Sequence, residues 1–331
     1  MLIIGDIHGC HAELLALLDL AGVGDDEVVV SVGDLVDRGP EPGAVIDFFR
    51  HRPGAVALCG NHERKHVRGV LSYSQQVTQA QLGARYADDV AWMATLPYHY
   101  ETDAVRVVHW GLYPGVPLDD VPADVRAGTT SGDQRLRERY GGRPWWEFDD
   151  DPRPAAFGHA VYPEPLVIDG RIFGLDTGAC HGMALTGLRL PERRLFTVPA
   201  AEDYWSRIKH AWQAPVLRAL PWATLSFEQI ERKLRSLRDP ELGDRVLDEI
   251  AAWLAGLRAA VPALRARLDE ESARVAAAAD PAQALGRHPA ARWLTRWRAN
   301  KLSPTHLGCA SPQDLCALAA ALGIALPATP L

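Results

Sequence analysis

Gly5-Asp6-Ile7-His8-Gly9 is the first of several short runs of metal-ligand residues in this chain, and it directly follows the apolar run Leu2-Ile3-Ile4. The later runs, in order, are Gly33-Asp34-Leu35-Val36-Asp37-Arg38-Gly39, Gly60-Asn61-His62-Glu63, His109 and Gly158-His159. Asp, Asn and His are the side chains that hold divalent metals through oxygen and imidazole nitrogen. Their recurrence along the first half of the chain predicts a metal site.

The first three runs each come after an apolar stretch, at residues 2–4, 28–30 and 55–58. Such stretches are typical of buried parallel strands, and open α/β sheets place their sites at the carboxyl ends of neighbouring strands. Two carboxylates, three histidines and one asparagine are enough for two metals that share a bridging carboxylate. Two metals about 3.5–4 Å apart promote in-line attack on phosphorus. The sequence therefore predicts a binuclear phosphoesterase.

Together, the patterns Gly-Asp-x-His-Gly, Gly-Asp-x-x-Asp-Arg-Gly and Gly-Asn-His-Glu resemble those of the calcineurin-like metallophosphoesterases. The Asp37-Arg38-Gly39 ending is similar to their phosphoprotein phosphatase branch, which includes bacterial diadenosine tetraphosphatases. The segment from Leu175 to Leu188 is similar to the closing segment of the bacterial members. The resemblance covers residues 1–199 and implies a catalytic domain over that range. Trp110, His181 and Met183 depart from the usual family residues, which leaves the shape of the substrate pocket open.

The resemblance implies a role for each ligand residue, and the six are Asp6, His8, Asp34, Asn61, His109 and His159. Asp34 would bridge the two metals, and His159 would join the metal that Asp6 and His8 hold. A water held by both cations loses its proton near neutral pH, and the bridging hydroxide would attack phosphorus directly. Bacterial relatives suggest two Mn²⁺ ions, with iron or zinc as alternatives.

His62 directly follows the ligand Asn61, so its side chain points elsewhere and is free to act. We expect it to be the general acid that protonates the leaving oxygen, oriented by Asp37. A structural histidine at a turn is the alternative interpretation. Arg38 presents a planar fork that grips two phosphate oxygens. Glu63 is expected to satisfy nearby backbone groups or a ligand histidine rather than coordinate metal.

Other substrate contacts are less specific in the sequence. Asn61 is expected to contact substrate as well as metal. The resemblance implies a second arginine ahead of Gly158-His159, and Arg135 or Arg137 fits best, although the arginines there also suit a solvated helical face. His181 lies in the closing segment and is a candidate contact. The aromatic residues near His109 and ahead of His159 either stack a nucleobase or pack in the core, and these are Trp110, Tyr113, Trp145 and Trp146.

The rest of the first 199 residues predicts an α/β fold of two sheets packed as a sandwich, flanked by helices. Strand–helix alternation up to Gly60 implies parallel pairing. Hairpin patterns follow at residues 98–109 and around Asp169-Gly170, so the second sheet is expected to be more antiparallel.

Residues 200–331 predict a small all-helical C-terminal region of unknown role. Ser226-x-x-Gln229 is a capping box, and Leu residues from Leu247 to Leu268 form an amphipathic stripe that Pro262 should bend or divide. Ser311-Pro312 is typical of a helix start. We assign no family to this region.

The formal net charge of −7 argues against general nucleic-acid or anionic-membrane binding. An anionic substrate must therefore be attracted by local cations. The five cysteines are scattered, which favours reduced thiols in a cytoplasmic protein. No signal peptide or membrane span is expected, and the sequence does not indicate an oligomeric state.

The leading hypothesis is a metal-dependent phosphatase whose substrate is a dinucleoside polyphosphate, as in bis(5'-nucleosyl)-tetraphosphatases. A serine/threonine phosphoprotein phosphatase is the alternative, because the same in-line attack serves both substrates. A polynucleotide-end phosphatase suits the acidic charge less well. A catalytically idle scaffold is a further alternative, and the presence of His62 and Arg38 argues against it.

Overall fold

The computed structural model describes residues 1–238, 245–303 and 305–330 and divides into two compact units, Met1–Gln213 and Ala214–Leu331. The division falls after the expected boundary at 199, so helix α8 (Tyr204–Ala211) belongs to the first unit. Tyr204 is buried there, and its hydroxyl donates to Oε1 of Glu13, 2.8 Å away. The first unit therefore includes a helix beyond the segment that carries the motifs.

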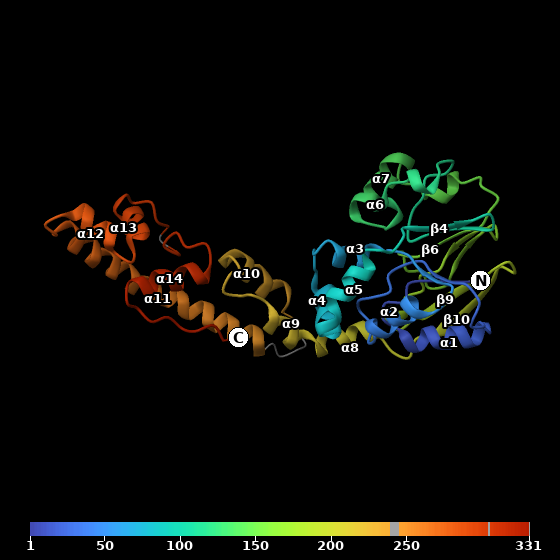
Figure 1. The fold of residues 1–331 in the computed structure, drawn as a ribbon, viewed down its shortest axis with the longest axis horizontal. Helices are drawn as coiled ribbons and strands as arrows, with labels where there is room; N and C mark the ends of the chain where they lie inside the picture. The colour runs from blue at the N-terminus through green and yellow to red at the C-terminus, as the bar shows by residue number, and fades with distance from the viewer. Residues whose placement is uncertain (239–244, 304, 331) are drawn as a thin grey trace. The chain divides into compact units, whose positions relative to one another are not determined.

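The first unit contains two five-stranded sheets, which confirms the predicted two-sheet α/β sandwich flanked by helices (Figure 1). The first sheet has the order β10-β9-β1-β2-β3, with β1 (Leu2–Ile4), β2 (Val29–Ser31), β3 (Ala55–Ala57), β9 (Ala184–Arg189) and β10 (Arg194–Pro199). The second has the order β4-β5-β6-β8-β7, with β4 (His99–Thr102), β5 (Val105–Val108), β6 (Ala155–Phe157), β7 (Leu166–Ile168) and β8 (Ile172–Gly174).

Both sheets mix parallel and antiparallel pairing. In the first, β1 pairs β2 and β2 pairs β3 in parallel, as the strand–helix alternation predicts. In the second, the predicted hairpins β4–β5 and β7–β8 are antiparallel, whereas β6 pairs both β5 and β8 in parallel. The second sheet is therefore only partly antiparallel, because β6 lies between strands that run in its own direction.

Helices and 3₁₀ turns connect the strands. The α-helices are α1 (His11–Ala21), α2 (Pro42–His51), α3 (Asn61–Val67), α4 (Tyr73–Leu82), α5 (Tyr86–Met93), α6 (Ala123–Arg126), α7 (Thr130–Tyr140) and α8. The 3₁₀ turns are η1 (Gly83–Arg85), η2 (Leu118–Asp120), η3 (Trp145–Phe148) and η4 (Ala179–His181).

Alternation along the strands divides the core into layers. Leu2 and Ile4 of β1 pack with residues of α1 and α2, whereas Ile3 between them packs with the second sheet. The same alternation in β6 turns Ala156 toward the first sheet and Phe157 toward the outer layer that contains Trp145 of η3. Figure 1 shows α1 and α2 beside the first sheet and α6 and α7 near β4. Helices therefore cover both outer faces of the sandwich.

The strand ends bring the polar motifs together. The three runs that follow β1, β2 and β3 lie at one edge of the first sheet, and β5 and β6 end directly before His109 and Gly158. The loops approach so closely that a Cβ atom at Gly60 would collide with the Asp34 carboxylate. A Cβ atom at Gly158 would likewise collide with Asp6. Glycine is required at both positions for contact between loops rather than for a turn.

The second unit is helical over the residues that the structure describes, as predicted. Its helices are α9 (Gln213–Ala219), which starts at the division, α10 (Phe227–Ser236), α11 (Arg245–Ala276), α12 (Pro281–Arg287), α13 (Ala291–Arg298) and α14 (Pro312–Ala321). Ser226 and Gln229 form the predicted capping box, and the Ser311 side chain accepts the backbone N–H of Asp314. Of the two outcomes predicted at Pro262, a division of the long helix is wrong, because α11 runs past it without a break; a bend stays a prediction.

The stripe of leucines in α11 is buried in a core of its own. Leu247, Leu254, Leu264 and Leu268 pack with side chains of α10, α13 and α14. Burial within the unit compensates for the single backbone hydrogen bond that Pro262 removes. Among the described helices, none is both long and apolar enough to span a bilayer.

We predict that a chain ending at Gln213 folds on its own, because it contains the whole of the first unit with all six candidate metal ligands. A chain ending at Glu202 should be less stable, because it lacks the buried Tyr204 and Ile208 of α8. The loss of two buried side chains should lower the free energy of unfolding by about 3–6 kcal/mol. Urea unfolding of the two chains measures the difference. Equal stability would show that α8 is not part of the first folding unit.

Candidate metal centre

The six predicted ligand residues converge on one buried site, which we term the ligand cluster: Asp6, His8, Asp34, Asn61, His109 and His159. Asp34 lies between two imidazoles, with Oδ2 at 3.6 Å from Nε2 of His8 and Oδ1 at 3.4 Å from Nε2 of His109. Asp6 accepts the backbone N–H of His159. The two oxygens of Asp34 thus face different imidazoles of the cluster, an arrangement that would allow the carboxylate to contact two cations.

Backbone carbonyls orient two of the imidazoles. Nδ1 of His8 lies 2.8 Å from the carbonyl of Val36, and Nδ1 of His109 lies 3.1 Å from the carbonyl of Val32. Because a carbonyl can only accept, each Nδ1 carries the proton, and each Nε2 lone pair faces the cluster. This arrangement is typical of metal-ligating histidines.

Burial keeps these imidazoles neutral. It lowers the pKa of His8, with Arg38 adding to the effect, and it also lowers the pKa of His109. Burial and the neighbouring His109 lower the pKa of His159 to about 4. A neutral imidazole has a lone pair to offer, whereas a protonated one does not.

The two cluster carboxylates behave differently. Burial raises the pKa of Asp6, and the nearby carboxylates Asp176 and Asp34 raise it further. Burial would also raise the pKa of Asp34, but the surrounding histidines, His109 first, hold it below its ordinary range. Asp6 therefore lacks positive charge that would favour its ionised form, and a cation would supply that charge.

The position of His159 differs from the expected division of the ligands. Its Nδ1 lies 3.0 Å from Oδ1 of Asn61, and its ring centroid lies 5.2 Å from that of His109. The imidazole therefore lies with Asn61 and His109, not with His8 as the resemblance implied. Only its backbone contacts Asp6, because the left-handed backbone at His159 turns the side chain away.

The donor set fits two divalent cations. Nε2 of His109 lies only 3.0 Å from Oδ1 of Asn61, so two acceptors face each other at hydrogen-bond distance. Asp6, Asp34 and His109 offer ligand atoms within 4.8 Å of one another, and so do His8, Asp34 and His62. Converging acceptors repel one another unless a cation lies between them, and Asp34 is common to both groups.

His62 lies beside the cluster and contacts the expected partner. Its Nδ1 is 2.5 Å from Oδ2 of Asp37, and its Nε2 is 3.8 Å from Oδ2 of Asp34. Two further residues bind Asp37: Nε2 of His66 lies 2.9 Å from Oδ1, and the amide of Gln75 donates to Oδ2. Burial alone would raise the pKa of Asp37, but the contacts with His62 and His66 hold it well below the ordinary value.

Arg38 reaches into the same space. Its Nη1 lies 3.2 Å from Nε2 of His8, and its Nη2 lies 3.1 Å from Nε2 of His62. The backbone at both Asp37 and Arg38 is left-handed, with φ of 72° and 67°. This uncommon conformation turns two consecutive side chains, one acidic and one basic, toward His62.

Glu63 binds backbone rather than metal, as expected. Its Oε1 accepts the N–H groups of Leu35 and Val36, and its Oε2 accepts those of Asp34 and Gly60, at 2.8–3.2 Å. Burial raises the pKa of Glu63 to about 8, and Asp34 adds to the effect, while the backbone donors oppose it. The carboxylate therefore joins the loops that follow β2 and β3.

The remaining candidate residues lie at different distances from the cluster. Nε of Arg135 is 3.0 Å from Oδ2 of Asp124, and its side chain is 56% exposed. Arg137, on the same helix α7, lines a separate cavity described below. His181 is exposed in η4, and partial burial and the charge of Arg38 lower its pKa. A second phosphate-binding arginine stays a prediction.

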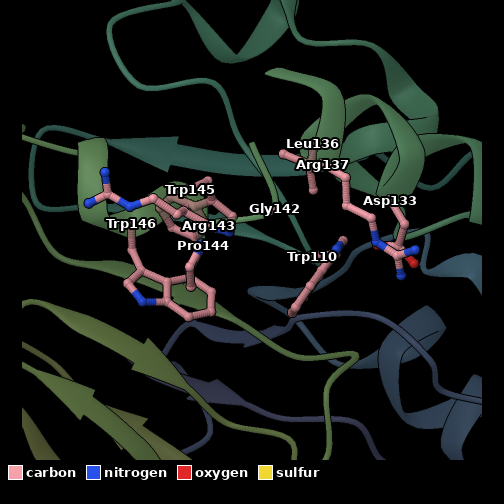
Figure 2. A pocket seen from close by; sticks show the side chains of 9 residues that line it. All are labelled: Trp110, Asp133, Leu136, Arg137, Gly142, Arg143, Pro144, Trp145 and Trp146. Carbon is pink, nitrogen blue, oxygen red and sulfur yellow. The ribbon is translucent and has the colours of Figure 1, made fainter. Parts of the chain in front are cut away.

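An aromatic cavity of about 240 Å³ lies beside the cluster (Figure 2). Its lining residues are Trp110, Asp133, Leu136, Arg137, Gly142, Arg143, Pro144, Trp145 and Trp146. The Trp110 ring centroid is 5.1 Å from that of His159, so this residue connects the cavity to the ligand cluster. Trp145 is buried, and Trp146 stacks on Phe157, so these two rings also belong to the core.

Three residues of the site were not identified from the sequence. His66 lies four residues after His62 on α3, a spacing that places both on one helical face and could have indicated a shared partner. Gln75 lies on α4 and gives no such signal. Asp176 lies close enough to Asp6 to raise its pKa, and the closing motif contained it without a role.

Comparison with known proteins agrees with this geometry. The calcineurin-like phosphoesterase family model matches residues 1–222. The chain is 27% identical over 240 residues to the asymmetrical bis(5'-nucleosyl)-tetraphosphatase of Halalkalibacterium halodurans, across 60% of this chain and 94% of that protein. It is 29% identical over 266 residues to the symmetrical bis(5'-nucleosyl)-tetraphosphatase of Edwardsiella ictaluri, across 60% and 95%.

A solved structure described as that of a candidate diadenosine tetraphosphatase is also similar. It shares 26% sequence identity with this chain, with a TM-score of 0.50, and the match covers 60% of this chain and 92% of that one.

The lowered pKa of His159 predicts a pH dependence of stability in the metal-free protein. In the unfolded chain its pKa returns to about 6.5, so below that pH the unfolded state binds the proton more readily than the folded state. Stability is therefore lost as the pH falls from 6.5 toward 4. Buried carboxyl groups titrate nearby, so the prediction concerns the difference between the wild type and His159→Asn.

Between pH 7 and pH 5, the wild type should lose about 2 kcal/mol more than His159→Asn. Urea unfolding in the presence of EDTA measures both proteins. A difference that stays constant with pH would contradict a neutral, buried His159.

Proposed function

Because the chain belongs to the calcineurin-like phosphoesterase family and is a metal-dependent phosphatase, we propose that it hydrolyses a phosphoanhydride of a dinucleoside polyphosphate at the ligand cluster. The observation that carries this proposal is the position of the aromatic cavity, which adjoins the cluster through Trp110 and His159. Two Mn²⁺ ions are the expected cofactors, with iron or zinc as alternatives.

The bound cations would supply positive charge against phosphate oxygens and make water acidic enough to attack phosphorus near neutral pH. We assign Asn61, His109 and His159 to one metal and Asp6 and His8 to the other, with Asp34 shared. The contact of His159 with Asn61 supports this division. Neutral imidazoles leave the charge of the cations largely uncompensated, which strengthens their attraction for phosphate.

His62 is proposed as the general acid. Its Nδ1 faces the Asp37 carboxylate, which can only accept, so Nδ1 carries one proton. The proton for the leaving oxygen would be a second one, on Nε2, once Arg38 binds phosphate and no longer donates to that atom. That atom lies 3.1 Å from Nη2 of Arg38. Nε2 of His62 and the Arg38 guanidinium, which would bind phosphate, therefore lie at the same position beside the cluster. Gln75 and His66 hold Asp37 from the other side and thereby fix its orientation.

The aromatic cavity supports a nucleotide substrate. Its tryptophans offer apolar rings, and Arg137 and Arg143 line it with positive charge. A nucleobase stacks on such surfaces, and base–aromatic stacking contributes about 1–3 kcal/mol. The relatives are named asymmetrical and symmetrical tetraphosphatase. Both names indicate the same substrate class, but they imply hydrolysis of different phosphoanhydride bonds.

The test is a comparison of substrates with the Mn²⁺-loaded protein. We expect kcat/KM for diadenosine tetraphosphate to exceed that for phosphoserine and phosphothreonine peptides at least tenfold. The products show which bond is hydrolysed: asymmetrical hydrolysis gives ATP plus AMP, and symmetrical hydrolysis gives two ADP. A preference for the phosphopeptides would replace this proposal with a phosphoprotein phosphatase.

Asp34→Asn is the control for that comparison. One negative charge fewer must then hold two dications, so metal content and turnover should both fall to background. Metal content is measured by elemental analysis after gel filtration. Full activity with two metals per chain would contradict the binuclear assignment.

His62→Asn tests the general acid. The variant should retain metal but lose roughly 10²–10⁴ in turnover of phenyl phosphate, whose leaving group needs a proton. It should lose much less with p-nitrophenyl phosphate, because p-nitrophenolate leaves without one. Equal losses on the two substrates would mean that His62 does not protonate the leaving oxygen.

A further inference from the structure

A second cavity, of about 300 Å³, opens directly onto the ligand cluster and carries an excess of positive charge. We term it the cationic cavity, and it is lined by Asn61, Arg64, Lys65, Arg68, Val70, Gly128, Thr129, Thr130, Asp133 and His159. Asn61 and His159 belong to the ligand cluster. Whatever occupies this cavity therefore lies next to the reacting phosphate.

The three cations lie on the same helical face as a proposed metal ligand. Arg64, Lys65 and Arg68 follow Asn61 by three, four and seven residues, the spacing of one face of a helix. Arg68 is the C-cap of α3 and keeps a helical backbone, so the seven-residue separation from Asn61 corresponds to about 10 Å. Positive charge thus extends from the metal site along the helix, over a length that suits a short chain of phosphates.

These cations have no acidic partner in the part of the chain that the structure describes, where no carboxylate lies within 4 Å of their nitrogens. Many other arginines of the first unit form ion pairs, for example Arg50 with Asp89. Arg64 is held in place by Tyr98: its Nη1 donates to the hydroxyl at 2.9 Å, and its guanidinium lies over the ring. Its Nε is buried and, among the described residues, lacks an acceptor.

The opposite lining is mostly neutral. Gly128, Thr129 and Thr130 come from the start of α7, and Asp133 is the only carboxylate among the lining residues. Three cations against one anion leave a net positive cavity in a chain whose formal charge is −7. Such a local reversal of sign attracts an anionic ligand. Asp133 also lines the aromatic cavity, so the two cavities adjoin there.

We infer that the cationic cavity binds the phosphates that flank the scissile phosphate, so that the enzyme selects a polyphosphate chain over a single phosphate. The inference rests on the proposed function, because it takes the reacting phosphate to lie on the ligand cluster. Arg64, held by Tyr98, forms the fixed part of the subsite, and Lys65 and Arg68 add two further charges to its lining. Charge-assisted hydrogen bonds to phosphate oxygens provide the affinity.

The test removes two charges without removing a packed side chain. Lys65→Gln/Arg68→Gln is chosen because no side-chain hydrogen bond or ion pair of either residue occurs among the described residues. Arg193→Gln/Arg194→Gln removes the same charge and is the control for it; this pair also loses the hydrogen bond from Arg193 to the carbonyl of Gly170 and the contact of Arg194 with the Phe196 ring. Arg193 and Arg194 are exposed at the β9–β10 turn, next to the amino end of β1 and hence at the opposite edge of the sheet.

The two probes are inorganic tripolyphosphate and orthophosphate. Tripolyphosphate is added as its magnesium complex so that it does not remove Mn²⁺ from the protein by chelation. Calorimetric titration of the full-length, Mn²⁺-loaded protein measures binding, and inhibition of p-nitrophenyl phosphate hydrolysis gives an independent constant. Lys65→Gln/Arg68→Gln should bind tripolyphosphate roughly 10- to 100-fold more weakly. Its affinity for orthophosphate and its kcat/KM for p-nitrophenyl phosphate should change less than about twofold, since neither reaches beyond the cluster. The control should match the wild type in every assay.

Other results would overturn the inference. Unchanged tripolyphosphate binding in Lys65→Gln/Arg68→Gln would exclude a phosphate subsite, and equal weakening in the control would mean a general effect of charge. Weakened hydrolysis of an acidic phosphopeptide with unchanged tripolyphosphate binding would assign the cavity to a peptide instead. If diadenosine tetraphosphate is not hydrolysed, the proposed function fails, yet the calorimetric comparison still decides whether the cavity binds a phosphate chain.

Discussion

The ligand cluster depends on the hydrogen bonds that the buried Glu63 carboxylate accepts from the backbone of two loops. Its two oxygens accept four backbone N–H groups, three from the loop after β2 and one from Gly60 after β3. These loops carry the Asp34 bridge and the Asn61 ligand. An unmet buried donor or acceptor costs about 1–3 kcal/mol, so the loops keep this arrangement only while all four bonds are made. Glu63, which has no proposed role in the reaction, thereby sets the separation of Asp34 and Asn61, which have one.

The strained backbone around the cluster depends on such contacts. His8, Asp34, Asp37, Arg38 and His159 all adopt positive φ although none is glycine. Each such residue costs of order 1 kcal/mol or more, and it persists only where the surroundings determine its conformation. In extended backbone, successive side chains point to opposite sides. The left-handed residues instead direct neighbouring side chains toward the same site. Hydrogen bonds to the carbonyl of Asp34 from the N–H groups of Ile7 and His8 join the strained loops to each other.

Charge is distributed to suit an anionic substrate on an acidic protein. The cluster itself is built from carboxylates and neutral imidazoles, so it attracts cations. Arg38 lies at one side of it, and Arg64, Lys65 and Arg68 lie at the other, along α3. With metals bound, the reacting phosphate would face Arg38 on the His8 and His62 side, and a longer phosphate chain would face the cationic cavity on the Asn61 and His159 side. The aromatic cavity beyond Trp110 adds an apolar surface, which a phosphate alone does not need and a nucleotide does.

Local patterns in the sequence predicted much of this protein. The candidate ligand residues, the parallel strands before them and the helix caps at Ser226 and Ser311 each depend on a few consecutive residues, so they could be predicted directly from the chain. The contact of Asp37 with His62 joins residues 25 positions apart, and it was expected because both belong to the motifs. The long helix was less predictable: Pro262 breaks a hydrogen bond locally, but burial of the surrounding leucines keeps α11 continuous.

What the sequence by itself determined is the set of candidate metal ligands and the strands that precede them, because side-chain type and strand pattern are local properties. Only the tertiary structure shows which candidate ligands lie together, such as His159 and Asn61, which are 98 residues apart in the chain. It also placed Arg135 on Asp124 and joined Gln75 and His66 to Asp37. Contacts between distant segments depend on how loops pack after the sheets form, and no short stretch of sequence contains that information.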